Sequence, residues 1–263
     1  ALNLSRICNA VASLGIMRRA LLESKSYASR RNAFGQRLTG YPMVRDTLGK
    51  MSAKLHAETI TVFDFIKLYE KVTDGEADER EQVLNRLFIA LIKKETAEQA
   101  IHFSHEAIEM HGGNGYIEDF VTPRLLRDAQ VLTVWEGTAN ILALELIRLV
   151  TKFKAHDLFV DEMKNRLSAL EECGLTQVLD REIDSVQEGL TAFASYDYSL
   201  QTFEAKRWMK RMSDVYESVV SLEWAAKYGR KYEKLAEVFM EDTWGLRKSG
   251  EPMKTVECFE ELI

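Results

Sequence analysis

Apolar side chains recur every three or four positions over most of the first 150 residues. In the first segment they stand at Leu4, Ile7, Val11 and Leu14, a spacing that places them on one face of a helix. The same periodicity returns in three later segments. The sequence therefore predicts four long helices, at about residues 2–33, 42–72, 79–111 and 139–152.

The breaks between these helices have local causes. Pro42 suits the first turn of a helix, where its missing N–H is not needed. Residues 73–75, which are Thr-Asp-Gly, favour a turn between the second and third helices. A shorter helix is expected at residues 123–130. Long helices joined by short turns favour an antiparallel four-helix bundle.

After about residue 155 the pattern contains more charge and shorter periodic segments. It predicts helices near residues 157–172, 176–199, 203–229 and 231–242, followed by a less ordered tail. We therefore expect an all-α protein with two parts. Residues 1–154 form the four-helix bundle domain, and residues 155–263 form a helical C-terminal extension.

Composition narrows the class of protein. The chain has 263 residues, of which 46% are hydrophobic and 29% charged, so it can bury a core. It contains only three prolines, which agrees with a nearly all-helical fold. Its three scattered cysteines do not form a disulfide or zinc pattern, and the spacing of His105 and His111 disfavours a metal site. These features suit a reducing, intracellular location, which would be the mitochondrial matrix in a eukaryote and the cytoplasm otherwise.

Charge gives a weaker indication of partners. The net charge is -6, and the acidic excess falls in the second part, which disfavours general binding to nucleic acid or membranes. No apolar stretch approaches the roughly 20 residues of a membrane span. Lys206, Arg207, Lys210 and Arg211 form a basic strip at helical spacing. Such a strip is usually a solvent-exposed helix face or one side of an ion-pair network. The alternative is that it contacts nucleic acid.

Residues 111–116, His-Gly-Gly-Asn-Gly-Tyr, form the densest glycine cluster in the chain. One glycine there is explained as a helix cap. Three glycines in four positions also let a cofactor phosphate or adenine approach the backbone closely. The segment is not a dinucleotide-binding fingerprint, because no strand precedes it and its spacing differs.

Glu136 stands between Trp135 and Gly137 in a break between helices. It is either a solvated loop carboxylate before an ordinary N-cap at Thr138, or a general base. The second interpretation rests on the neighbouring aromatic ring, since a partly dry turn disfavours a carboxylate's charged form. The helix that begins at Ala139 also offers free N–H groups to a pyrophosphate.

Several segments together resemble the C-terminal helical domain of the acyl-CoA dehydrogenases, over about residues 1–150. Each segment alone is weak, but their order and spacing match the family. The matching segments are residues 2–6 (LNLSR), 27–35 (YASRRNAFG), 111–116 (HGGNGY), 127–129 (RDA) and 135–140 (WEGTAN).

The resemblance implies a reaction and a set of site residues. Glu136 matches the base that removes the α-proton of an acyl thioester while the β-hydride passes to FAD. Arg6 matches an arginine near the substrate, and Trp135 and Gly137 flank the base at the substrate side. The implied cofactor-binding residues are Arg31 and Phe34, which reach the flavin of a neighbouring subunit, together with Glu109, Gly113, Thr138 and Asn140.

The resemblance also leaves alternatives open. Glu109 and Asn140 stand where many relatives carry glutamine, and Trp135 is bulkier than the usual tyrosine. The pattern is most similar to the branch that contains the bacterial alkylation-response flavoprotein and long-chain acyl-CoA dehydrogenases. The first hypothesis is the C-terminal part of an FAD-dependent, long-chain acyl-CoA dehydrogenase. The others are a flavoprotein that binds nucleic acid through its C-terminal helices, and an inactive helical assembly module.

The family implies partners and missing parts as well. We expect acyl-CoA as substrate and a homodimer or homotetramer, with an electron acceptor that the sequence does not identify. Relatives carry an N-terminal helical domain and a middle β-domain before this one. Because the chain opens directly into helical periodicity, we expect it to be a fragment whose upstream part is missing.

Overall fold

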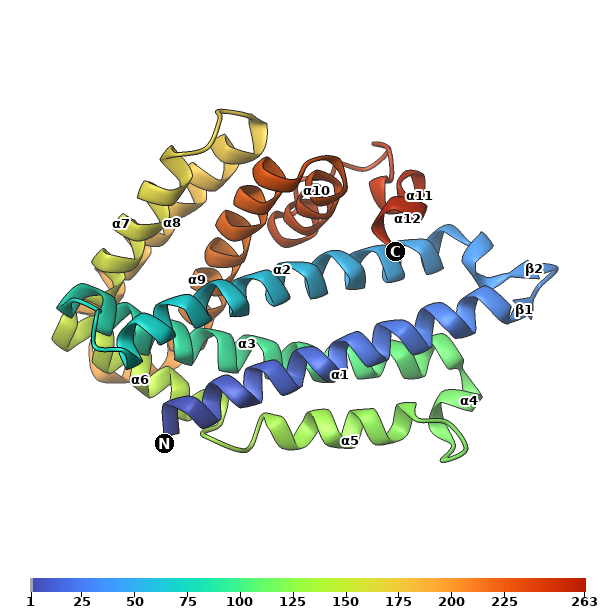
Figure 1. Ribbon diagram of the computed structural model, residues 1–263, viewed down its shortest axis with the longest axis horizontal. Helices are drawn as coiled ribbons and strands as arrows, with labels where there is room; N and C mark the ends of the chain where they lie inside the picture. Colours follow the sequence, from blue (N-terminus) through green and yellow to red (C-terminus); the bar gives the residue numbers. More distant parts are fainter. Residues whose placement is uncertain (1) are drawn as a thin grey trace.

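The computed structural model describes residues 2–263, most of which lie in helices (Figure 1). The all-α class predicted from the sequence is confirmed, and the two short strands pair as one antiparallel hairpin. In chain order the elements are α1 (Leu2–Arg30), β1 (Asn32–Ala33), β2 (Gln36–Arg37), η1 (Leu38–Gly40), α2 (Pro42–Thr73), α3 (Glu79–His111), α4 (Gly113–Tyr116), α5 (Thr122–Leu132), α6 (Ala139–Phe153), α7 (Ala155–Ser168), α8 (Gly174–Ser195), α9 (Tyr198–Tyr228), α10 (Arg230–Trp244), α11 (Lys254–Glu257) and α12 (Phe259–Leu262).

The first part of the chain is built on three long helices, in which α2 runs opposite to α1 and α3 (Figure 1). Helices α1, α2 and α3 run side by side, and α5 lies along α1 and α3 (Figure 1). Pro42 is the first residue of α2, as expected. Helix α3 begins with a capping box, in which Glu81 N–H donates to Asp78 Oδ1 at 2.8 Å. The helix predicted at residues 139–152 forms as α6, and it packs against both α3 and α9.

The extension packs on this bundle through a shared apolar core. Lys154 adopts a left-handed conformation with φ 49°, so α7 begins immediately after α6 and turns away from it. The ring of Phe88 on α3 stacks on Tyr216 of α9, with centroids 4.4 Å apart. One cluster of buried apolar residues draws on both parts of the chain. The domain boundary at residue 154 stays a prediction, since packing is continuous across it.

The C-terminal tail is more ordered than the sequence predicts. Helices α11 and α12 lie against α2, where Thr255 Oγ1 donates to Asp46 Oδ1 at 2.7 Å. Phe259 and Leu262 are buried in the same contact. Two four-residue helices are too short to show a readable apolar period, and tertiary packing determines their conformation.

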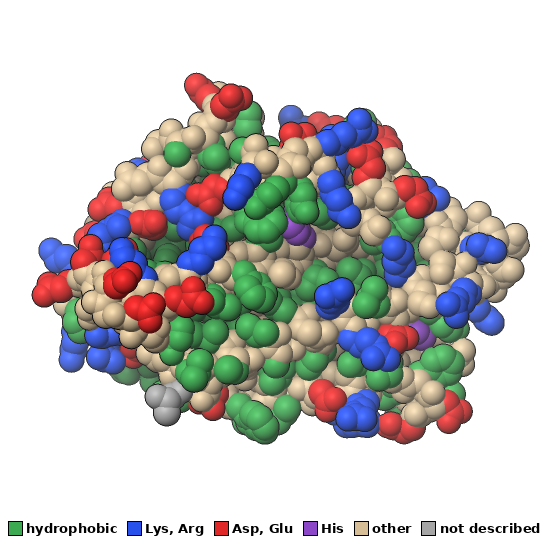
Figure 2. Space-filling view, in the orientation of Figure 1, with side chains coloured by type: hydrophobic (Ala, Val, Ile, Leu, Met, Phe, Trp, Pro, Cys, Tyr) green, Lys and Arg blue, Asp and Glu red, His purple; other side chains and the backbone are tan. Residues whose placement is uncertain are grey.

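One face of the bundle exposes apolar side chains. Leu4, Val11 and Leu22 of α1 are all exposed. Figure 2 shows apolar side chains gathered across the centre of the face in view. Within residues 2–263, none of the helices combines the length and apolar character needed to cross a membrane. Contiguous exposed apolar side chains on a protein surface are typical of sites that contact other surfaces.

Candidate functional site

The predicted site residues lie in two groups at opposite ends of α1. Arg6 contacts the loop between α5 and α6, which we call the Glu136 turn (residues 133–138). Arg31 and Phe34 lie at the other end, near the α3–α4 junction; we call this region the hairpin end (residues 27–41 and 109–116). At a rise of about 1.5 Å per residue, Arg6 and Arg30 are roughly 36 Å apart along the helix.

The Glu136 turn has an unusual backbone. Glu136 has φ 61° and Gly137 has φ 102°, so two consecutive residues occupy positive φ. A residue with a side chain disfavours this region because its Cβ crowds the backbone. Such conformations persist only where the surrounding structure imposes them, and they cluster at functional sites.

Side chains from two helices impose this conformation. Arg6 Nε of α1 donates to Glu136 O at 2.9 Å, and Lys93 Nζ of α3 donates to Gly137 O at 2.7 Å. Just before the turn, Asn9 Nδ2 donates to Leu132 O at 3.0 Å. The backbone of the turn is therefore fixed by two cations, and the Glu136 carboxylate acts electrostatically on one of them, Lys93.

Lys93 is the residue that sequence reasoning missed here. It is 1% exposed, and burial lowers the pKa of its ammonium group to about 8, with a further lowering by Arg6 and an opposing effect of Glu136. A lysine at this depth places positive charge beside the Glu136 carboxylate. The sequence does contain a hint of this burial. Lys93 lies four positions before Ala97 and seven before Ala100, a spacing that places all three residues on the buried face of α3.

The α6 helix start provides an open anion-binding position. Thr138 occupies the N-cap, as the ordinary interpretation expects, but its side chain makes no capping hydrogen bond. Thr138 and Asn140 are exposed. The first N–H groups of α6 therefore remain available to a phosphate, together with the Thr138 hydroxyl.

Trp135 does not shield the turn as the sequence predicted. Its side chain is 60% exposed, and Glu136 is half-buried. The partly dry environment expected for Glu136 is not produced by Trp135 in this chain.

The hairpin end displays Phe34 on a second turn of positive φ. Phe34 has φ 50° and Gly35 has φ 94°, and the Phe34 side chain is 98% exposed. Tyr41 Oη donates to Ala33 O at 2.8 Å and to Phe34 O at 3.1 Å. A fully exposed aromatic side chain buries no apolar surface within its own subunit, and the strained backbone that carries it is costly. Both features point to a contact with another surface.

The glycine cluster separates into structural and free positions. Gly112 caps α3 with φ 58°, and a Cβ on Gly115 would lie 2.4 Å from Ile108 O. The fold therefore requires both of these glycines. Gly113 is different, because it has no positive φ and a Cβ there would meet nothing within 4 Å. Of these three glycines, only Gly113 has no structural role that explains it, so it is the one that could serve the close approach of a cofactor to the backbone.

A surface pocket connects this cluster to the end of α1. It has a volume of about 350 Å³ and is lined by Tyr27, Arg30, Arg31, His111 and Asn114, among others. Asn114 Nδ2 donates to Tyr27 Oη at 3.1 Å, and the Tyr27 and His111 rings lie 4.2 Å apart. The pocket joins an arginine pair to aromatic rings, a combination suited to an anionic group carrying a flat ring.

The structure regroups the predicted cofactor residues. Gly113 and Glu109 lie at the hairpin end with Arg31 and Phe34, whereas Thr138 and Asn140 lie at the Glu136 turn. The two groups lie at opposite ends of α1, roughly 36 Å apart along that helix. The assignment of these residues to the cofactor stays a prediction.

The basic strip on α9 is part of an ion-pair network. Lys210 pairs with Asp214, Arg211 lies 2.6 Å from Glu182, and Arg207 lies 3.2 Å from Glu204. Three of the four residues of the strip therefore match the ion-pair interpretation, and Lys206 is exposed.

Comparison with known proteins gives a consistent result for the first part of the chain. The family model described as "Acyl-CoA dehydrogenase, C-terminal domain" matches residues 1–150. The "Acyl-CoA dehydrogenase family member 11" of Caenorhabditis elegans is 39% identical over 148 residues, which cover 56% of this chain and 24% of that protein. The "Putative acyl-CoA dehydrogenase AidB" of Escherichia coli is 33% identical over 149 residues, which cover 57% of this chain and 27% of that protein.

Solved structures extend the similarity to the helices after residue 150. Caenorhabditis elegans ACDH-11 in complex with C11-CoA superimposes with a TM-score of 0.82 at 27% identity, covering 91% of this chain and 42% of that one. An acyl-CoA dehydrogenase from Bacillus anthracis complexed with FAD covers 99% of this chain and 51% of that one, with a TM-score of 0.76 at 19% identity. At that identity the likeness shows the fold alone. The chain spans about a quarter of the length of the two curated relatives above.

Proposed function

The chain belongs to the acyl-CoA dehydrogenase family, and on that premise we propose that it carries the C-terminal domain of an FAD-dependent enzyme that oxidises acyl-CoA thioesters. Glu136 is the catalytic base. The observation that carries this proposal is the Glu136 turn, where two cationic side chains bind the backbone carbonyls of Glu136 and Gly137 and so fix the position of the glutamate.

The proposed chemistry requires one positioned base. The α-proton of a thioester is weakly acidic, so its removal needs a carboxylate that is fixed in place and poorly solvated. The Glu136 carboxylate takes this proton, the β-carbon loses a hydride, and a double bond forms between the two carbons. FAD, when bound, supplies the two-electron acceptor for that hydride.

The residues present fit such a cofactor. The uncapped start of α6, with Thr138 and Asn140, offers N–H and side-chain donors to a pyrophosphate. The pocket at the hairpin end offers Arg31 and an exposed Phe34. These two positions are too far apart for one flavin within one chain. We infer that the flavin lies between two copies, so that the active protein is a homodimer or homotetramer.

The proposed substrate is a long-chain acyl-CoA. Its support is limited to the similarity to ACDH-11, whose solved structure contains C11-CoA, an acyl chain of eleven carbons at the upper end of the medium-chain range. The similarity covers 91% of this chain, which includes the extension. Rates of flavin reduction with acyl-CoA substrates of different acyl-chain length would test this preference.

The test uses the longer protein that carries this chain, with its flavin bound. Acyl-CoA is mixed with it without oxygen, and the loss of flavin absorbance is followed. Glu136→Gln keeps the size and polarity of the side chain but removes its basicity. We expect the rate of flavin reduction to fall about 10²-fold or more, with flavin content unchanged.

Glu145→Gln is the matched control. Glu145 lies on α6 and pairs with Arg148 at 3.1 Å, a surface contact that contributes little. Its reduction rate should equal that of wild type. Unchanged flavin reduction by Glu136→Gln would show that Glu136 is not the base.

A further inference from the structure

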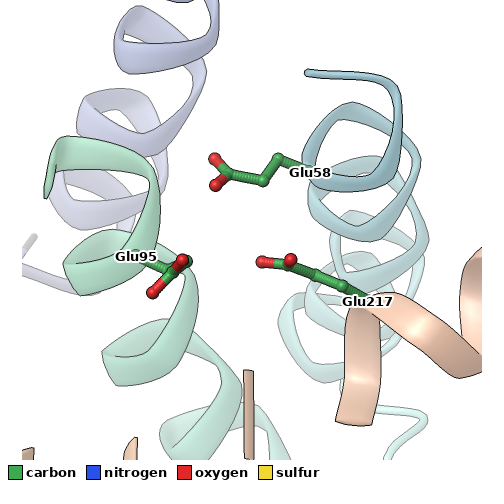
Figure 3. A group of neighbouring side chains, drawn as sticks. All are labelled: Glu58, Glu95 and Glu217. Atoms are coloured by element: carbon green, nitrogen blue, oxygen red, sulfur yellow. The ribbon is translucent and has the colours of Figure 1, made fainter. Parts of the chain in front are cut away.

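Three buried carboxylates meet where the bundle and the extension join. Glu58 of α2, Glu95 of α3 and Glu217 of α9 point toward one another (Figure 3). Each of them is at most 3% exposed, and an oxygen of each lies within 4.8 Å of the others. Three like charges at this distance in a buried site repel one another strongly unless something compensates them.

Two lysines compensate part of this charge from one side. Lys54 Nζ lies 2.6 Å from Glu217 Oε2, 2.9 Å from Glu95 Oε1 and 3.2 Å from Glu58 Oε1. Lys210 pairs with Asp214 and lies 3.5 Å from Glu95 Oε1. Four carboxylates therefore face two ammonium groups, and the fully ionised cluster keeps two uncompensated negative charges.

The other side of the cluster borders a small cavity. The cavity is lined by all three glutamates and by Thr61, Thr96 and Ser213, but not by Lys54. Its volume is about 10 Å³, close to the space that a single water-sized particle needs. The site is therefore large enough for one small ion and too small for an organic ligand.

Oxygen atoms around this cavity lack hydrogen-bond partners. They are Glu58 Oε2, Glu95 Oε2, Thr61 Oγ1 and Ser213 Oγ, and all belong to residues that are at most 4% exposed.

The two hydroxyls are informative. Thr96 lines the same cavity and donates back to its own helix, to Ile92 O at 2.8 Å. Thr61 and Ser213 make no such bond. Buried polar atoms in folded proteins are normally paired, so these hydroxyls point to an unidentified partner.

We propose that this cavity binds one small divalent cation of the size of Mg²⁺ or Mn²⁺. Glu58, Glu95 and Glu217 are its carboxylate ligands, and the hydroxyls of Thr61 and Ser213 supply two further oxygens. Every available ligand atom is oxygen, which selects a hard cation. A charge of +2 balances the two uncompensated negative charges. Because calcium takes six to eight oxygens at longer distances, the cavity is too small for it.

The ion ties the extension to the bundle. Its ligands come from α2 and α3 on one side and from α9 on the other. This inference does not depend on the proposed enzymatic activity.

The experiment measures metal binding to the full chain. Protein stripped with EDTA is dialysed against Mn²⁺, and bound metal is counted by elemental analysis. Thermal unfolding is recorded with Mn²⁺, Mg²⁺ and Ca²⁺, using K⁺ at equal ionic strength as the control. We expect one Mn²⁺ per chain and a melting temperature that rises with Mn²⁺ or Mg²⁺ concentration.

Three variants locate the ion. Glu58→Gln should abolish binding, and Glu106→Gln, a partly exposed carboxyl of α3 outside the cavity, should leave it unchanged. Ser213→Ala removes a hydroxyl that has no partner within residues 2–263. It should therefore leave the metal-free protein folded, yet weaken Mn²⁺ binding about 10-fold or more.

Three results would overturn the proposal. The first is no stoichiometric metal together with no change in melting temperature, which would leave water or protons in the cavity. The second is stabilisation by Ca²⁺ alone. The third is metal binding that survives both Glu58→Gln and Ser213→Ala, because the ion would then lie elsewhere.

Discussion

The Glu136 turn and the Phe34 turn use the same backbone device in different surroundings. In each, a residue with a side chain adopts positive φ and a glycine follows with positive φ. At the first turn, Arg6 and the buried Lys93 bind two consecutive carbonyl oxygens. At the second turn, one neutral tyrosine hydroxyl binds the carbonyls of Ala33 and Phe34.

The difference agrees with the two roles that we propose. Two cations from two helices fix the position of Glu136 within its own subunit, which suits a base that must meet a particular carbon atom. The Phe34 side chain is 98% exposed, which suits a contact with another surface.

The largest effect within this comparison should come from Lys93→Met. Methionine has a similar length but cannot donate to Gly137 O, so the Glu136 turn loses one of its anchors. We expect the rate of flavin reduction by acyl-CoA to fall about 10–100-fold, since small displacements of a base are costly. Flavin content should stay unchanged. Anaerobic stopped-flow reduction over a range of pH provides the measurement.

Lys93→Arg is the conservative control for that experiment. Arginine keeps the positive charge and the donors, so most of the activity should return. A rate for Lys93→Met equal to that of wild type would remove Lys93 from the positioning of Glu136. A lower rate explained entirely by lost flavin would assign it a structural role only.

Phe34→Ala should have the next largest effect, on association between subunits. A buried aromatic anchor at an interface typically contributes about 2 kcal/mol or more. We expect the dissociation constant of the oligomer to rise about 10–30-fold. The isolated subunit should keep its melting temperature, because the side chain is 98% exposed. Analytical ultracentrifugation over a dilution series measures the change.

Phe203→Ala provides a matched control on the extension. Phe203 is also exposed, at 79%, but it lies on the regular helix α9 rather than on a strained turn. It should leave association unchanged. If both variants weaken the oligomer equally, the special role of the Phe34 turn is refuted.

Sequence patterns predicted the helices better than the site. Helical periodicity located the long helices because their buried faces repeat over many turns. Glu136, Arg6 and Phe34 were reached through residue chemistry and family motifs. Lys93 was missed because a lysine inside a helix is usually solvent-exposed, and only the folded packing shows that its ammonium reaches Gly137 O. The separation of Gly113 from Thr138 was also unpredictable, since it depends on the direction of α5.

Replacing the glycine of each turn by alanine should lower the free energy of unfolding by different amounts at the two turns. Gly137→Ala forces a side chain into positive φ and places its Cβ 3.3 Å from Ile141 Cγ2. Gly35→Ala meets no atom within 4 Å and suffers the backbone strain alone. We expect a destabilisation of about 2 kcal/mol for Gly137→Ala and about 1 kcal/mol for Gly35→Ala.

Urea unfolding of both variants provides this measurement. Gly113→Ala is the control, because its Cβ meets open space and its φ is not positive. It should unfold with wild-type stability. Equal losses for Gly35→Ala and Gly137→Ala would show that packing against Ile141 adds nothing to the Glu136 turn.

The smallest effect should come from Tyr41→Phe, which tests the neutral support of the Phe34 turn. The variant removes one hydroxyl that binds two carbonyl oxygens, at 2.8 Å and 3.1 Å. A net hydrogen bond contributes about 0.5–1.5 kcal/mol, and water can replace this one at an exposed turn. We therefore expect a loss near the lower value, about 0.5 kcal/mol, and a two- to threefold weaker association of subunits. The association effect should stay below that of Phe34→Ala, since the aromatic side chain itself makes the contact and Tyr41 only restricts its position. A weakening as large as that of Phe34→Ala would mean that the fixed turn, rather than the exposed ring, determines assembly, and the two turns would then work by the same principle.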